Sequence, residues 1–425
     1  MEKFRIIGPT PLVGRVSASG AKNAALPALA ATLLTDEPVL LHRVPRVRDL
    51  RTMRRLLDHL GIESAEDGPA LRLRRARPDS HSDALYDLVK TMRASVLVLG
   101  PLLARHGRAR VSLPGGCAIG VRPIDQHLKG LAALGAEVRL EHGYVETTAQ
   151  VLRGTRFRFD LPTVTGTENL LLAACLARGT TVLGNCAREP EIVDLARLLN
   201  AMGARIAGAG GEEIVIEGVA GLHGATHTII PDRIEGGTYL IGAALSGGDV
   251  LLEEAVAADL APLLDKLAEV GVEVSVGETG IRVRADRQGH VLTARDIETA
   301  PHPGFPTDLQ AQYMALMTRA EGVSTIRETV FENRFQHVPE LARMGADVRV
   351  DGNAARIRGR TPLAGATVMA TDLRASACLV LAGVAAEGET IVDRIYHLDR
   401  GYEGMELKLQ SLGARVARIS DSSTA

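Results

Sequence analysis

The chain has 425 residues, 46% of them hydrophobic and 24% charged, which is enough for two or three domains with sizeable cores. Its 49 Lys and Arg nearly balance 51 Asp and Glu, and only 3% of the residues are aromatic, with no Trp. This composition excludes a strong overall attraction to nucleic acid or to an anionic membrane, and it disfavours aromatic platforms for stacking bases. We therefore expect neither nucleic acid nor a membrane as a partner.

Targeting signals and metal motifs are also missing from the sequence. The first residues, MEKFR, lack the apolar core of a signal peptide, and every apolar run is interrupted before it reaches the length of a bilayer span. The Cys at 117, 175, 186 and 378 follow neither a CxxC nor a His-x-x-His spacing, so neither a zinc site nor a disulfide framework is supported. We expect a cytoplasmic protein with no metal and no cofactor.

A short motif containing Gly recurs six times along the chain. It reads LGIE, LGAEV, MGARI, VGVEV, MGADV and LGARV, with the Gly at 61, 135, 203, 271, 345 and 413. The gaps between these Gly are 74, 68, 68, 74 and 68 residues. Each Gly is suited to cap the C-terminus of a helix, and each copy predicts a helix–strand–helix–strand unit. Since the gap pattern starts again after three units, we predict two sets of three.

The first helix of each unit is apolar almost all round, as a helix inside a core should be. In chain order these helices are predicted at 24–34, 96–103, 170–176, 240–245, 313–317 and 378–385. The second helix, for example 51–60, is amphipathic and should cover the outside. We predict an α/β fold in which three units surround a pseudo-threefold axis and two such domains leave a cleft between them. The alternative, a linear solenoid, is disfavoured by the long period and the fully apolar inner helices.

The inner helices nevertheless begin with polar and charged residues. If the units share one orientation, these helix starts face the same cleft, where free N–H groups favour anions. Lys22, Arg93 and Arg374 add full positive charges. Capping alone can explain Thr91, Thr307 and Asp372. It does not explain Lys or Arg in a first turn, where the helix dipole disfavours cations, so we predict that an anionic substrate binds there.

One Cys lies in a loop rather than in an apolar helix. Cys117 belongs to LPGGCAIGVRPIDQ, whose three Gly and two Pro predict a loop, and Arg122 could lower the pKa of the thiol. Cys175 and Cys378 lie in predicted apolar helices and should be inert, whereas Cys186 is ambiguous. Residue chemistry alone leaves Cys117 either catalytic or incidental, since no His is singled out as its partner.

At this loop the chain closely resembles the enolpyruvyl transferases, and among them the UDP-N-acetylglucosamine 1-carboxyvinyltransferase family. The resemblance covers nearly the whole chain and rests on SGAKNAALP, LPGGCAIGVRPIDQH, APHPGFPTDLQAQ, ETVFENRFQHVPEL, TDLRASACLVLAG and IYHLDRGYEGMELKL. It implies an inside-out α/β barrel with a first globule at 22–231 and a second at 232–425 plus 1–21. One departure is visible: the family usually reads SVGATEN where this chain has TVTGTEN at 163–169.

The resemblance also implies a reaction. The family transfers the enolpyruvyl group of phosphoenolpyruvate to the 3'-hydroxyl of UDP-N-acetylglucosamine and releases phosphate, which is the first committed step of peptidoglycan synthesis. By motif match, Cys117 is the general acid at C3 and can form a covalent adduct, and Asp308 receives the hydroxyl proton. Lys22 and Arg400 complete the implied catalytic set. The chain is expected to work as a monomer.

The implied binding residues form two overlapping sets. For phosphoenolpyruvate they are Lys22, Asn23, Arg122, Arg334, Asp372, Arg374 and Arg400. For UDP-N-acetylglucosamine they are Arg93, Arg122, Pro123, Ile124, Asp125, Gln126, Leu161, Pro162, Thr163, Val164, Asp308 and Val330. We expect the Cys117 loop to close over the nucleotide sugar. Two alternatives stay open: the related shikimate-pathway transferase, and a non-catalytic repeat protein that binds polyanions.

Overall fold

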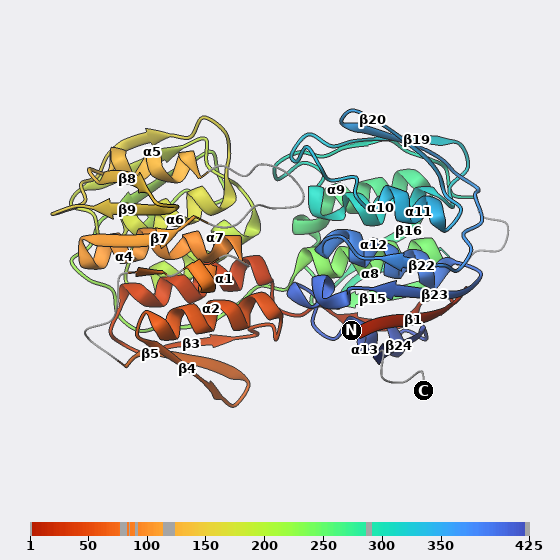
Figure 1. Ribbon diagram of the computed structural model, residues 1–425, viewed down its shortest axis with the longest axis horizontal. Helices are drawn as coiled ribbons and strands as arrows, with labels where there is room; N and C mark the ends of the chain where they lie inside the picture. The colour runs from red at the N-terminus through yellow and green to blue at the C-terminus, as the bar shows by residue number, and fades with distance from the viewer. Residues whose placement is uncertain are drawn as a thin grey trace. The chain divides into compact units, whose positions relative to one another are not determined.

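The computed structural model describes residues 2–76, 83–84, 86–89, 92–113, 124–285 and 291–420, which form two compact units (Figure 1). The first unit contains the described residues of 20–116 and 122–230, and the second contains those of 1–19 and 231–425. The domain boundaries predicted from the sequence lie one or two residues from these limits.

The first unit contains three four-stranded sheets of the same design. Their strand orders are β14 (Thr226–Thr228), β3 (Val39–His42), β5 (Ala70–Arg75), β4 (Ile62–Asp67); β6 (Asp83–Ala84), β7 (Arg108–Ser112), β9 (Tyr144–Thr148), β8 (Glu137–Glu141); and β10 (Arg156–Arg158), β11 (Thr180–Gly184), β13 (Glu213–Glu217), β12 (Arg205–Ala207). In every sheet the first pair is parallel and the other pairs are antiparallel.

The second unit repeats this design. Its sheets are β2 (Val13–Ser17), β15 (Asp249–Glu253), β17 (Gly280–Arg284), β16 (Glu273–Gly277); β18 (Ile297–Glu298), β19 (Val323–Arg327), β21 (Ala354–Arg358), β20 (Asp347–Asp351); and β22 (Thr367–Met369), β23 (Gly388–Asp393), β1 (Glu2–Gly8), β24 (Arg415–Ser420). Strands from the start of the chain, β1 and β2, complete two of these sheets, and β14 closes the first unit in the same way. Each unit is therefore a closed ring of sheets, which excludes the linear solenoid.

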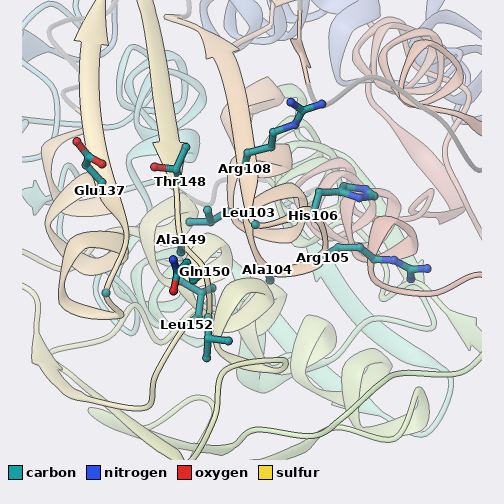
Figure 2. A pocket seen from close by; sticks show the side chains of 13 residues that line it. Leu103, Ala104, Arg105, His106, Arg108, Glu137, Thr148, Ala149, Gln150 and Leu152 are labelled. Atoms are coloured by element: carbon teal, nitrogen blue, oxygen red, sulfur yellow. The ribbon is translucent and has the colours of Figure 1, made fainter.

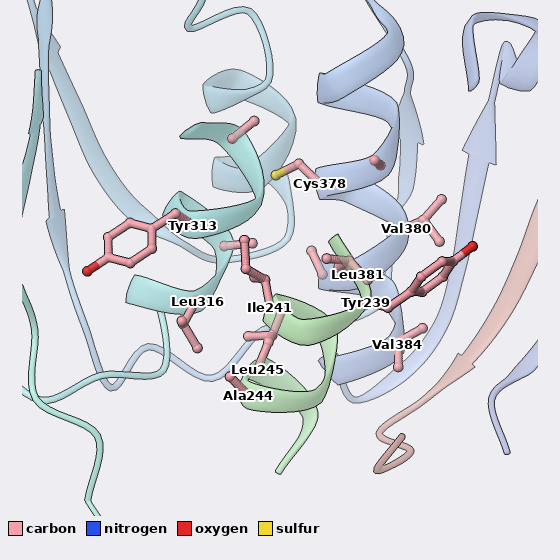
Figure 3. Close-up of a cluster of buried hydrophobic side chains, with 14 of the residues drawn as sticks. Tyr239, Ile241, Ala244, Leu245, Tyr313, Leu316, Cys378, Val380, Leu381 and Val384 are labelled. Carbon is pink, nitrogen blue, oxygen red and sulfur yellow. The ribbon is translucent and has the colours of Figure 1, made fainter. Parts of the chain in front are cut away.

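Three inner helices fill the centre of each unit. In the first unit they are α1 (Lys22–Ala31) continued by η1 (Thr32–Leu34), η2 (Arg93–Val98) continued by α4 (Leu99–His106), and α6 (Val164–Ala174). In the second they are α8 (Arg233–Ser246), η3 (Thr307–Leu309) continued by α10 (Gln310–Met317), and α12 (Leu373–Ala385). Figure 3 shows side chains of α8, α10 and α12 packed together, among them Ile241, Leu316 and Leu381, all fully buried. Helices inside and sheets around them confirm the predicted inside-out α/β fold.

The predicted amphipathic helices are α2 (Arg48–His59), α5 (Asp125–Ala133), α7 (Pro190–Ala201), α9 (Ala257–Val270), α11 (Val338–Arg343) and α13 (Met405–Ser411). Two further short helices are α3 (Tyr86–Val89) and η4 (Ile395–Arg400). All six motif Gly have a positive φ, between 88° and 101°, which confirms their prediction as helix C-caps. The structure adds two strands to each predicted unit: an outer strand that pairs in parallel, and a third strand in the centre of the sheet. Among the described residues, no helix combines the length and apolarity needed to cross a membrane.

Candidate active site

In the second unit, the carboxylate of Asp308 lies between two arginines. Its Oδ1 accepts a hydrogen bond of 2.6 Å from Arg334, and its Oδ2 accepts one of 2.8 Å from Arg374. The side chain of Asp308 is 25% exposed, whereas both arginine side chains are only 5% exposed. The structure thus brings together three predicted site residues, and the arginines belong to separate motifs 26 and 66 residues away from Asp308.

This pairing controls the charge of Asp308. Its largely desolvated surroundings would raise the pKa of the carboxyl, but the positive charges of Arg374 and Arg334 outweigh that effect and hold the pKa well below its usual range. Asp308 is therefore ionised at neutral pH. It can accept a proton, but its basicity is weakened as long as both arginines bind it.

Behind Arg374 lies a buried polar network. The guanidinium of Arg374 lies over the ring of Tyr402, 5.5 Å from its centroid, and the Tyr402 hydroxyl is 2.9 Å from Oγ1 of Thr238. Gln312 donates to this hydroxyl, to Thr238 and to the backbone carbonyl of Asp308. Nη1 of Arg374 is buried and makes no hydrogen bond to the described residues. Because a buried guanidinium N–H without a partner is costly, it is a suitable donor for an anionic ligand.

Glu328 fixes the surroundings of Asp308 from the other side. Its Oε2 accepts a 2.8 Å hydrogen bond from Thr307, whose hydroxyl in turn accepts one of 3.0 Å from Arg334. Its Oε1 accepts from the backbone N–H groups of Val330 and Phe331, at 2.8 and 3.2 Å. The hydroxyl of Thr307 therefore orients Arg334 rather than capping a helix, so the capping explanation given above for Thr307 is wrong. Sequence reasoning also missed Glu328, although it opens one of the quoted motifs.

The start of α12 carries two further predicted residues. Oδ1 of Asp372 accepts hydrogen bonds from the backbone N–H groups of Arg374 and Ala375, at 2.8 and 3.1 Å, so the capping role predicted for Asp372 is confirmed. Arg400 ends η4, and the next residue, Gly401, packs against Leu373: an added Cβ would lie 2.7 Å from its Cδ2. The close approach that glycine permits therefore sets Arg400 beside the first residue of α12.

In the first unit, Lys22 and Asn23 open α1, and both are partly buried. Nζ of Lys22 is 3.2 Å from Oδ2 of Asp49, a buried residue in the first turn of α2 that sequence reasoning missed. No side chain caps α1 or the start of η2, where Arg93 lies, in contrast to α6, α8 and α12. This agrees with the argument that capping does not explain the cations at these helix starts.

Two segments predicted to contact the nucleotide sugar lie together in the first unit. Oε1 of Gln126 accepts a hydrogen bond of 2.9 Å from the backbone N–H of Asp160, and its amide donates to the carboxylate of Asp160 at 2.9 Å. These bonds hold 124–126 against 161–164. Leu161 is 72% exposed, which leaves an apolar side chain available to a ligand. The sequence did not reveal the connecting role of Asp160.

The departure from the family pattern has a packing explanation. Thr163 caps α6, because its hydroxyl accepts a 3.3 Å hydrogen bond from the N–H of Gly166. A Cβ at Gly166 would lie only 2.3 Å from Cγ2 of Thr163. The methyl group of Thr163 thus occupies the space that the family's Ala would use. Oγ1 of Thr165, at the position where the family has Gly, is 3.2 Å from Nε2 of the buried His127.

The described cysteines are all unreactive by environment. Cys175, Cys186 and Cys378 are free and buried. Burial raises the pKa of Cys175 and of Cys186 to about 12, and it raises the pKa of Cys378 further. The ambiguous Cys186 therefore belongs with the core cysteines. Cys117, Arg122 and Pro123 lie outside the described residues, and Thr91 does as well.

Within the described ranges, no group of three or more His, Cys, Asp or Glu could hold a metal ion.

Residues 6–409 match the profile of the family described as EPSP synthase (3-phosphoshikimate 1-carboxyvinyltransferase). The chain belongs to this enolpyruvyl transferase family.

Two curated relatives are similar over nearly their whole length. One from Sorangium cellulosum is 60% identical over 99% of both chains, and one from Koribacter versatilis is 56% identical over 99% of this chain and 97% of the relative. Both are named UDP-N-acetylglucosamine 1-carboxyvinyltransferase. The resemblance found from the motifs is thus confirmed at the level of the family.

Solved structures agree on the fold. The enolpyruvyl transferase NikO from Streptomyces tendae superposes with a TM-score of 0.86 at 28% identity, covering 98% of each chain. EPSP synthase from Acinetobacter baumannii gives a TM-score of 0.76 at 18% identity, covering 99% of this chain and 100% of the other. The second similarity shows the shared fold alone.

Proposed function

We propose that the chain transfers the enolpyruvyl group of phosphoenolpyruvate to the 3'-hydroxyl of UDP-N-acetylglucosamine and releases phosphate, in the cytoplasm and as a monomer. This is the reaction that opens peptidoglycan synthesis, and through it the chain would serve cell-wall growth, cell shape and cell division. The observation that carries the proposal is the full-length identity of 56–60% to relatives of that name. The LPGGCAIGVRPIDQH loop supports it further.

The reaction is an addition followed by an elimination. The sugar oxygen bonds to C2 of phosphoenolpyruvate while its proton goes to a base and C3 receives a proton from an acid. C3 then loses a proton, the C2–O bond to phosphate breaks, and the double bond forms again. We assign Cys117 as the acid and Asp308 as the base. Lys22, Arg122 and Arg400 would hold the phosphate, with Asn23 and Asp372 positioning the reacting groups.

The pairing of Asp308 suggests how its basicity is switched. With both arginines bound, the carboxylate is a weak base. An incoming phosphate or carboxylate competes with Asp308 for Arg334, and it also accepts a hydrogen bond from the buried Nη1 of Arg374, whose Nη2 is bound to Asp308. As the guanidinium groups turn to the substrate, the carboxylate loses their charge stabilisation and its pKa rises. In this mechanism anion binding activates the base, so a proton is removed only when the donor is in place.

The nucleotide sugar would be held largely by the first unit. Arg93, Arg122–Gln126 and Leu161–Val164 are assigned to it. Within these ranges, Gln126 is hydrogen-bonded to Asp160 and the side chain of Leu161 is exposed. In the second unit, Asp308 and the backbone of Val330, which Glu328 holds at 2.8 Å, complete the set. Glu328 itself is a positioning residue in this proposal, because it reaches the substrate only through Thr307 and Val330.

The decisive experiment measures phosphate release with both substrates, with each substrate alone, and with Cys117→Ser. We expect release only with both substrates, and a large loss of turnover in Cys117→Ser because a hydroxyl is a far weaker acid than a thiol. Shikimate 3-phosphate in place of the nucleotide sugar tests the alternative named by the family description. Turnover with shikimate 3-phosphate, or full activity of Cys117→Ser, would overturn the proposal.

Labelling of the thiols provides an independent check. With limiting alkylating reagent or a fosfomycin-type epoxide, mass spectrometry should find Cys117 modified first, since the other three thiols are buried and their pKa values are raised. UDP-N-acetylglucosamine should slow this labelling if the loop closes over it. Equal labelling of Cys117 and Cys186 would contradict the assignment.

A further inference from the structure

A pocket in the first unit is separate from every residue assigned to the substrates. It has a volume of about 750 Å³ and is lined by the end of α4, the start of β7 and the segment that follows β9 (Figure 2). Its lining residues are Leu103 to Arg108, Gly135, Glu137 and Thr148 to Leu152. The volume lies within the range of small-molecule sites, which is about 300–1,000 Å³.

The polar margin of this pocket is set by strand register. Arg108 of β7 pairs with Thr148 of β9, and Thr148 pairs with Glu137 of β8, so the three side chains lie in one row across the sheet. The carboxylate of Glu137 is bound by Nε and Nη2 of Arg139, at 3.0 and 2.6 Å. Its negative charge is therefore compensated, whereas Arg108 adds a positive charge to the pocket.

Three more basic side chains gather beside Arg108. Arg105 forms an ion pair with Asp36, and Arg75 of β5 lies 3.7 Å from the same carboxylate. Nη2 of Arg75 is 3.2 Å from Nε2 of His106. Figure 2 shows Arg105, His106 and Arg108 on one side of the pocket, with Glu137 and Thr148 on the other. Two arginines thus share one carboxylate within a group of four basic side chains.

The contact with Arg75 fixes the form of His106. A guanidinium can only donate, so Nε2 of His106 must accept and the imidazole is neutral with its proton on Nδ1. Burial and the charges of Arg75, Arg105 and Arg108 lower the pKa of His106, and burial and Arg105 lower the pKa of Arg75. The arginine charges therefore repel one another and keep His106 neutral; Asp36 compensates part of this positive charge, and a bound anion would compensate more of it.

The dipole of α4 explains only part of this arrangement of basic side chains. Arg105 and His106 occupy the last turn of α4, where cations interact favourably with the helix dipole. Arg75 belongs to another element, and its side chain is only 7% exposed. Arg108 lies beyond the helix, on a strand. The dipole gives no reason for a desolvated Arg75 or for the exposed Arg108.

We propose that this pocket binds a small organic anion that carries a phosphate or pyrophosphate group. Arg105, Arg108 and the Nδ1–H of His106 would contact the anionic group, as bidentate guanidinium groups do in phosphate sites. The apolar residues of the lining would contact the organic part; they are Leu103, Ala104, Val151 and Leu152. Because the pocket is larger than a phosphate ion requires, it is suited to a phosphorylated metabolite.

Titration calorimetry with inorganic pyrophosphate at constant ionic strength tests this site in the full chain. The variants are Arg108→Gln, whose side chain is exposed so that folding should be unaffected, and Arg105→Gln/Arg108→Gln. We expect both to weaken one binding event by about tenfold or more, because each removes a charged hydrogen-bond donor. Any binding of pyrophosphate by the proposed substrate residues is common to all variants and cancels in the comparison.

The matched control is Arg156→Gln, which removes an exposed arginine of the same unit that is paired with Glu213 at 3.0 Å. It should bind pyrophosphate like the unaltered chain. Phosphate release from the two substrates should be unchanged in all these variants, so a failed proposed function and a failed pocket give different results. Identical isotherms for the unaltered chain and Arg108→Gln, or equal losses in Arg156→Gln, would overturn the proposal.

Discussion

Asp308 shows what a sequence reveals about a single residue and what it does not. Its motif marks it as a site residue, and the positions of Lys22 and Arg374 at helix starts already point to an anion. The pairing with Arg334 and Arg374 was not predictable, because 26 and 66 residues of chain separate them from Asp308. Only the folded unit brings the three together, and that pairing decides the protonation state of the carboxylate.

Removal of Arg374 should change the pH dependence of the reaction. In Arg374→Gln one stabilising charge is lost while desolvation persists, so the pKa of Asp308 rises. More of the enzyme is then protonated at a given pH, and the acidic limb of the profile of kcat/KM moves to higher pH. Arg374→Lys is the control, since it keeps the charge and should keep the limb near its original place. If the limb is the same in Arg374→Gln and the unaltered chain, Asp308 is not the titrating base.

At the scale of elements, the start of α6 combines two substitutions that make sense only together. The sequence located the departure from the family pattern, but not its cause. Thr163 has one methyl group more than the family's Ser, and Gly166 has one fewer than the family's Ala. A Cβ added at Gly166 would lie only 2.3 Å from Cγ2 of Thr163, and this closeness is visible only in the folded structure. Neither residue alone indicates such compensation.

A double-mutant cycle measures this compensation. Gly166→Ala alone should lower the free energy of unfolding by about 1–2 kcal/mol, because the overpacking outweighs the better helix propensity of Ala. Thr163→Ser/Gly166→Ala should regain that loss, since Ser keeps the cap and removes the methyl group. Urea unfolding of the two single variants and the double variant gives the coupling energy. Additive effects would contradict the steric explanation.

At the scale of the whole molecule, the sequence predicted how the units are arranged, but it did not predict which strands make up each sheet. The recurring Gly and the apolar inner helices identified six units in two sets. The outer parallel strands escaped prediction because they contain only two to five residues, too few to show an alternating pattern. The resemblance already implied that 1–21 joins the second globule, but the sheet that β1 enters was not predicted, because pairing between Phe4 and Val392 leaves no local signal in either segment.

A buried acid in α6 should make the stability of the chain depend on pH. Glu168 is 1% exposed, and its Oε1 has no hydrogen-bond partner among the described residues. Burial, followed by repulsion from Glu191 and Glu189, raises the pKa of Glu168 well above its ordinary value of 4.5. The folded chain therefore retains a proton that the unfolded chain releases.

It follows that stability is fully present below the unfolded pKa of Glu168 and is lost as the pH rises through the folded pKa. Between these two pKa values the loss is about 1.4 kcal/mol per pH unit for one proton. Glu168→Gln keeps the shape but cannot ionise, so its free energy of unfolding should exceed that of the unaltered chain increasingly as the pH rises from 4 to 8. Urea unfolding across that range measures the difference, with Glu213→Gln as an exposed control on β13. Parallel pH profiles for Glu168→Gln and the unaltered chain would mean that Glu168 is ionised in the fold and that its charge is stabilised by other groups.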